Sequence, residues 1–135
     1  TIWKEKKTYP QLLLEALKEY SFYLDRFPSM VVGDFNCHIG QSGVRKSTGT
    51  FEDCIAEMEC HGLRSLYHEQ TNEKFGEEKT PTFFWQFNQE KPFFLDYAFC
   101  TMKPISFKIG DWEREISDHR PLIIELEEEP WDDRP

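Results

Sequence analysis

The spacing of apolar positions predicts two amphipathic helices in the first half of the chain. Thr8 is placed as the N-cap of a helix over residues 9–26. Its inward-facing positions recur at helical spacing and are Leu13, Leu17, Tyr20 and Leu24. A second helix is predicted to begin at Thr50 and to end at Gly62. Its inward-facing positions are Phe51, Ile55 and Met58.

Short aromatic or β-branched segments separated by turn residues predict strands in the rest of the chain. The expected strands are residues 30–36, 63–67, 82–87, 93–100, 105–109 and 121–126, with a hairpin loop at 88–92. The segment 93–100 is apolar on both faces apart from Asp96, and a sheet with two apolar faces must be covered on both. Two helices can cover only one face, so further polypeptide or a second copy of the chain is expected to supply a missing layer.

These elements together predict an α/β fold of the layered α+β kind. We expect one mostly antiparallel mixed sheet with two helices on one face. The length of 135 residues predicts a single unit over residues 1–135, and residues 127–135 form an acidic tail with five acids and one arginine.

Charge and cysteine usage narrow the choice of partners and compartment. The formal net charge is −9, which argues against tight nonspecific binding to a polyanion through charge alone. A phosphate ester would therefore need a divalent cation to mediate its binding. The sequence contains no Cys-x-x-Cys pair, signal peptide or apolar run of membrane length. We therefore expect a cytoplasmic protein with no membrane partner and with free thiols at Cys37, Cys54, Cys60 and Cys100.

Two other patterns invite functional interpretations that the spacing does not favour. Cys37-His38 and Cys60-His61 contain zinc-ligand residue types, but their spacing fits none of the usual zinc patterns. The glycine- and serine-rich segment 40–49 has two basic residues but lacks the residue order of a P-loop, so a solvated loop is expected there.

Polar residues at the ends of apolar segments are the candidates for chemistry. In an extended backbone Asp34 and Asn36 would point the same way, although Gly, Asp and Asn are also ordinary turn residues. Asp96 lies inside an apolar strand, and a buried carboxylate without a partner is costly, so it needs a histidine or a metal. Asp118 and His119 lie at the entry to the last strand, where they form either a site or a charged turn.

Three motifs, each attached to a strand, follow in a set order: Gly-Asp-Phe-Asn (33–36), Leu-Asp-Tyr (95–97) and Ser-Asp-His (117–119). This order resembles the second half of the endonuclease/exonuclease/phosphatase family, the fold of pancreatic deoxyribonuclease and of the apurinic endonucleases. Residues 82–85 are also similar to the Thr-Phe-Trp strand of the apurinic endonucleases. The resemblance runs from about Met30 to Leu126.

The resemblance implies metal-dependent hydrolysis of a phosphoester by an activated water. It implies that Asp34 orients or deprotonates the water and that Asn36 hydrogen-bonds the phosphate or Asp34. Asp118 matches a carboxylate at the metal centre. His119 matches the histidine that contacts the phosphoryl oxygens, and Asp96 matches the carboxylate that orients it. Mg²⁺ is the expected ion, with Mn²⁺ as a substitute, because Mg²⁺ prefers oxygen ligands and keeps waters that can attack.

One departure limits what the resemblance implies for this chain alone. The family's first half supplies an Asn and a Glu that complete the metal site. No part of residues 1–29 resembles the strands of that first half. The chain thus resembles the C-terminal half of a four-layer α/β sandwich, which would need its N-terminal half for activity. The alternative is a noncatalytic half-domain that pairs with a partner sheet or forms a homodimer. The phosphate-ester substrate is open among nucleic acids, sugar phosphates, inositol phosphates and lipid headgroups.

Overall fold

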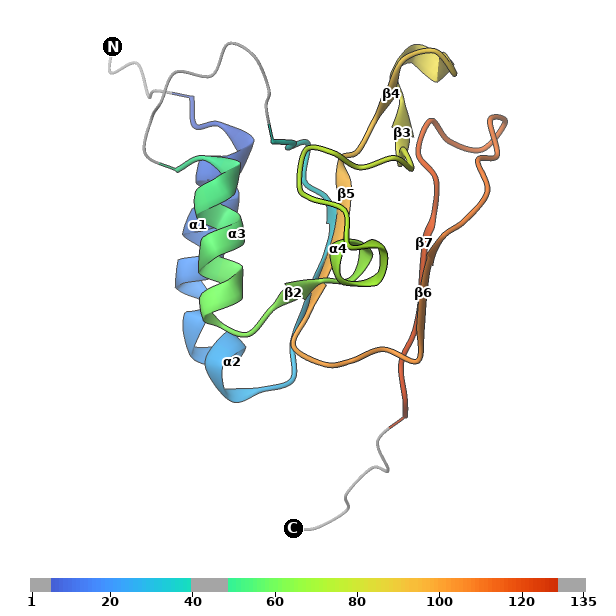
Figure 1. The fold of residues 1–135 in the computed structure, drawn as a ribbon. Coiled ribbons are helices and arrows are strands. Elements are labelled where there is room, and N and C mark those ends of the chain that lie inside the picture. The colour runs from blue at the N-terminus through green and yellow to red at the C-terminus, as the bar shows by residue number, and fades with distance from the viewer. Residues whose placement is uncertain (1–5, 40–48, 129–135) are drawn as a thin grey trace.

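The computed structural model describes residues 6–39 and 49–128, in which four α-helices accompany small antiparallel sheets (Figure 1). Most of the segment 40–49 and most of the acidic tail therefore lie outside the described residues. Helices α1 and α3 lie side by side on one side of the strands β1 and β5, and α4 lies between β5 and the β6–β7 hairpin (Figure 1). The protein is thus of the mixed α/β class, as predicted.

Two capping boxes begin the longer helices where the sequence predicts. Helix α1 (Tyr9–Glu19) starts after Thr8, whose Oγ1 accepts the Gln11 N–H at 3.3 Å while Gln11 Oε1 accepts the Thr8 N–H at 2.9 Å. Helix α3 (Phe51–Cys60) starts after Thr50 in the same way, with Asp53 in the reciprocal position. Hydrogen bonds from the backbone at Thr50, and then at Gly49, lower the pKa of the Asp53 carboxyl.

The single helix predicted over residues 9–26 is instead two helices. Tyr20 leaves the helical conformation (φ −92°, ψ 8°) and closes α1, and α2 (Ser21–Arg26) follows directly. The apolar spacing continues across this break, because Leu17 and Leu24 are the buried residues of α1 and α2. Periodicity alone therefore does not reveal the interruption.

The largest sheet has the order β1-β5-β2 and is antiparallel throughout. Strand β1 (Met30–Asp34) pairs with β5 (Asp96–Cys100), and the two-residue β2 (Arg64–Ser65) pairs with the other edge of β5. Every residue of β5 is buried, whereas alternate residues of β1 are exposed, among them Met30 (41%) and Val32 (43%). The prediction for 93–100 is therefore confirmed over β5, which this chain buries completely, with α4 on the side away from α1 and α3, whereas β1 leaves one face exposed.

All six predicted strands are shorter than expected, and three of them are cut to a fragment or divided. Residues 63–67 contain only β2, and the chain then turns into α4 (Leu66–Thr71). Residues 82–87 contain β3 (Phe83–Phe84) followed by a 3₁₀ turn (Trp85–Phe87). Residues 93–100 are divided between β4 (Pro92–Phe93) and β5. Side-chain contacts outweigh strand propensity at α4, where His68 stacks on the Phe75 ring with centroids 3.7 Å apart.

The predicted single sheet is divided into three. Strands β3 and β4 form a short hairpin, and β6 (Ser106–Ile109) and β7 (Leu122–Glu125) form another. The core is rich in aromatic rings from segments distant in sequence: Phe35, Phe51, Tyr97 and Phe99 have ring centroids within 4.9–6.5 Å of one another in five pairs. These contacts join α3 to β5 and fix the strand on which the candidate site is built.

Candidate active site

Strand pairing brings two of the predicted acids face to face. Asp34 at the end of β1 lies opposite Asp96 at the start of β5. The next pair along the ladder is hydrogen-bonded, because the Phe35 N–H donates to the Leu95 carbonyl at 3.0 Å. The two kinds of pair alternate in an antiparallel sheet, so Asp34 and Asp96 form a non-hydrogen-bonded pair. Side chains approach most closely at such pairs. The two carboxylates therefore lie on the same face at one end of the sheet.

The buried Asp96 has the histidine partner that its position requires. His119 Nδ1 lies 2.8 Å from Asp96 Oδ2 and 3.1 Å from Oδ1. Burial raises the pKa of the Asp96 carboxyl, while hydrogen bonds from Thr82 and His119 act in the opposite direction. An ionised Asp96 accepts the Nδ1–H and thereby fixes the tautomer and the orientation of the ring.

The other edge of the imidazole faces two further acids. His119 Nε2 is 3.6 Å from Asp34 Oδ2 and 4.0 Å from Asp118 Oδ1. The side chains of Asp34 and Asp118 are about one-third exposed, whereas that of Asp96 is largely enclosed. Hence Asp96 orients the ring from inside the protein, and the two solvent-accessible acids lie beside Nε2.

The β3–β4 hairpin holds His119 in place. Phe83 forms an isolated antiparallel bridge with His119, and the two rings have centroids 4.6 Å apart. On either side, the Phe84 N–H donates to the Asp118 carbonyl at 2.9 Å and the Arg120 N–H donates to the Thr82 carbonyl at 2.7 Å. The site therefore depends on a hairpin that contributes none of the predicted acids.

Arg120 anchors the segment next to the histidine through backbone carbonyls. Its Nε donates to Gly110 O at 2.7 Å, and its Nη1 and Nη2 lie 3.4 Å from Pro81 O and 3.5 Å from Ile109 O. The half-buried guanidinium thus links β6, the approach to β3 and the entry to β7.

Asn36 is the predicted site residue whose backbone conformation differs from the prediction. Strand β1 ends at Asp34, and Asn36 adopts a left-handed conformation with φ 50°. Its backbone N–H donates to Asp34 Oδ1 at 2.9 Å, forming a turn that fixes the Asp34 carboxylate. The prediction that the strand continues to Asn36 is wrong, because the backbone turns before that residue. The predicted contact between the two residues exists, but the backbone makes it.

Three donors at this site come close enough together to bind a metal ion. Single ligand atoms of Asp34, Asp96 and His119 all lie within 4.8 Å of one another. Asp118, the residue predicted as the metal ligand, is outside this grouping but adjoins it through His119 Nε2. Among the described residues, neither of the Cys-His pairs forms such a grouping, in line with the expectation that their spacing does not suit zinc.

The thiols fit structural roles. All four cysteines are unpaired, and only Cys60 is exposed. Burial raises the pKa of Cys37 to about 12 and that of Cys54 to about 11, which keeps both as neutral thiols at ordinary pH. Cys37 is therefore a core residue, although it adjoins the candidate site in sequence.

Sequence reasoning missed Thr82 as part of the site. Its side chain is fully buried, and Oγ1 accepts the N–H groups of Leu95 and Asp96 at 3.0 and 3.2 Å. The signals in the sequence are a threonine among aromatic strand residues and the similarity of residues 82–85 to a family strand, and neither distinguishes a buried acceptor from an ordinary strand residue.

Comparison with known proteins gives no independent assignment, because no protein-family model and no curated protein matches the chain. In the part of the chain that the structure describes, every helix is too short or too polar to cross a membrane.

Proposed function

We propose that this chain is the C-terminal half of a divalent-metal-dependent phosphoester hydrolase of the endonuclease/exonuclease/phosphatase type. The observation that carries the proposal is the Asp96–His119 hydrogen bond together with the positions of Asp34 and Asp118 at the opposite nitrogen. The three sequence motifs that resemble the family supply these four residues.

In the proposed reaction Asp34 orients the attacking water or accepts its proton, and the water oxygen forms a bond to phosphorus. The bond from phosphorus to the leaving oxygen breaks, and that oxygen keeps the electron pair and takes a proton from solvent. Asp96 holds Nδ1–H of His119, so that Nε2 faces the phosphoryl oxygens and stabilises their charge as a hydrogen-bond donor when protonated. The backbone N–H of Asn36 holds one oxygen of Asp34, which leaves the other oxygen for the water.

The donor set fits a divalent cation in part. Asp34 and Asp118 offer carboxylate oxygens, which Mg²⁺ prefers, and Mg²⁺ is commonly bound by one or two carboxylates together with waters and substrate oxygens. When bound, the cation would neutralise phosphate charge, which an acidic chain cannot do itself. Mn²⁺ is proposed as a substitute, since it also suits carboxylate and water ligands.

A missing layer is part of the same proposal. The exposed apolar residues Met30 and Val32 on β1, and Ile123 on β7, are the surface that we assign to contact with the other half of a four-layer sandwich. The missing half would also complete the metal site. We therefore propose that activity needs both halves and that this chain alone is poorly active.

The second candidate is a noncatalytic half-domain that pairs with another sheet or with its own copy. The same exposed side chains on β1 favour it, because a sheet face that is apolar and uncovered drives association. In a homodimer one copy would stand in for the other's missing half.

The test of the hydrolase is an activated aryl phosphodiester assay with Mg²⁺, with and without the N-terminal half of the parent protein. We expect turnover only with both halves and metal, and a loss of about 100-fold or more in His119→Ala and Asp34→Asn. His38→Ala is the matched control, since His38 is a half-buried histidine outside the cluster. Turnover that persists without divalent cations, or that is unchanged in His119→Ala, would refute the proposal.

A further inference from the structure

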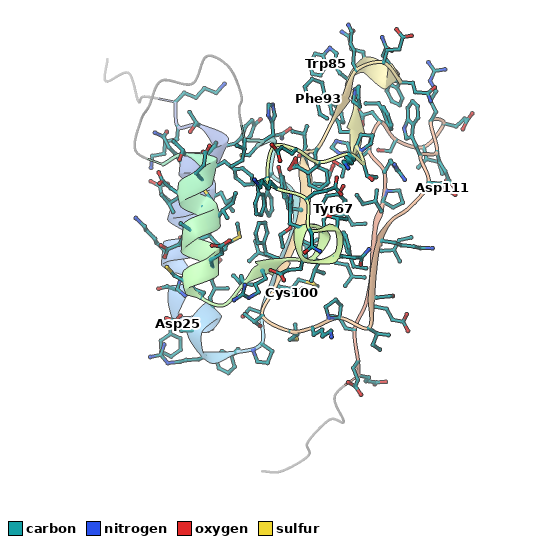
Figure 2. The ribbon with its side chains drawn as sticks, viewed as in Figure 1. Asp25, Tyr67, Trp85, Phe93, Cys100 and Asp111 are labelled. Carbon is teal, nitrogen blue, oxygen red and sulfur yellow. The ribbon has the colours of Figure 1, made fainter. Side chains whose placement is uncertain are left out.

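A cleft lies at the end of β5 opposite the candidate active site. It has a volume of about 520 Å³, and its walls are the start of α4 and the segment from Cys100 to Phe107. In Figure 2, Cys100 lies at the end of β5 away from the hairpin residues Trp85 and Phe93. Asp96 begins β5 and Cys100 ends it, so the cleft and the carboxylate–histidine cluster lie at opposite ends of one strand.

The floor of the cleft is apolar. Leu66, Cys100 and Phe107 line it and are buried. Burial raises the pKa of the Cys100 thiol, so the group is neutral and acts as a small apolar side chain. A volume of this size is in the range of small-molecule sites, and such sites are mostly apolar with a few polar groups.

The rim combines flexible apolar and charged side chains. Ile105 is 59% exposed, and Met102 is half-buried, with an unbranched side chain that adapts to different shapes. The charged residues of the lining are two cations, Arg64 and Lys103, and one acid, Glu69. Arg64 lies 3.6 Å from Glu69 in an exposed pair, which holds the guanidinium only weakly.

The cleft is therefore locally cationic on a chain with a net charge of −9. We propose that it binds a small amphipathic carboxylate, with the apolar body on the Leu66–Cys100–Phe107 floor and the carboxylate at Arg64 and Lys103. An Arg fork suits a carboxylate, and a mobile Lys adds a point charge. This site is separate from the proposed hydrolase centre and does not depend on that assignment.

The proposal is tested on the intact 135-residue chain by amide NMR titration with octanoate, with 1-octanol as the uncharged counterpart. We expect saturable shifts confined to residues 64–70 and 100–107, with a dissociation constant on the order of 1 mM. Octanol is expected to bind the same residues roughly three- to tenfold more weakly, because exposed ion pairs add little affinity.

Variants separate the apolar and the charged contributions. Ile105→Asp should abolish octanoate binding, whereas Ile116→Asp, at a residue 77% exposed in the loop before His119, should leave it unchanged. The double variant Arg64→Gln, Lys103→Gln should reduce octanoate binding to the octanol level and leave octanol binding unchanged. Equal affinity for octanoate and octanol in the native chain, no saturable shifts, or shifts spread over the exposed aromatic residues of α2 would each overturn the proposal.

Discussion

Replacing Thr82 by valine tests whether its hydroxyl supports the candidate site. Valine keeps the shape of threonine but removes Oγ1, which accepts the Leu95 and Asp96 N–H groups. Thr82 is fully buried, so water cannot replace the acceptor. Each buried donor left unpaired costs about 1–3 kcal/mol, which gives about 2–6 kcal/mol for the two.

Serine is the matched control because it keeps the oxygen and removes only a methyl group. Its cost from lost burial is about 1 kcal/mol. The difference in free energy of unfolding between the two variants therefore separates the contribution of the hydrogen bonds from that of packing. Typical domains have a free energy of unfolding of about 5–15 kcal/mol. The valine variant should therefore be much less stable than the native chain but still folded, unless the native value lies near the lower limit.

The measurement is urea unfolding followed by tryptophan fluorescence, with the free energy of unfolding extrapolated linearly to water. A second readout is the pH titration of the Asp96 carboxyl by NMR. The Thr82 hydrogen bond lowers the Asp96 pKa, so that pKa should rise further above its ordinary value in Thr82→Val but not in Thr82→Ser. If the free energy of unfolding of Thr82→Val is within about 0.5 kcal/mol of that of the native chain, the hydroxyl is not the acceptor on which β5 depends.

Two further predictions concern the helices and the open sheet face. The Asp25 hydrogen bond raises the His61 pKa, so its stabilisation is complete below the ordinary value of 6.5 and is lost as pH rises through the higher folded value. The free energy of unfolding, measured with urea from about pH 6 to pH 9, should fall in the native chain by an amount that His61→Gln does not show. The prediction is contradicted if the free energies of the two proteins change with pH in parallel. Sedimentation should show self-association that Val32→Asp removes and the exposed control Leu12→Asp retains, and a native monomer at high concentration would count against an associating face.

The sequence predicts helix starts better than strand lengths in this protein. Thr8 and Thr50 begin helices because a capping box uses neighbours within four residues. Strand β2 ends after Ser65 because the next residues turn into α4, where His68 packs on Phe75, and contacts of that kind are not encoded in local propensity.

The same contrast holds at the candidate site. The isolation of Asp96 in an apolar strand predicts that it needs a partner, and the structure provides His119. Strand alternation predicts an extended Asn36, and it fails there because the backbone takes a positive φ. The sequence does not predict the role of Thr82, because that role arises from the position of the β3–β4 hairpin beside β5.

The guanidinium of Arg120 has a consequence for any pH–rate profile of the site. Arginine stays protonated over the whole range in which enzymes are assayed, and its three acceptors are backbone carbonyls that do not titrate. The residue adjoining His119 is thus tethered equally firmly in mild acid and in mild base. A change of rate with pH would therefore not arise from a loosening of the polypeptide that presents His119.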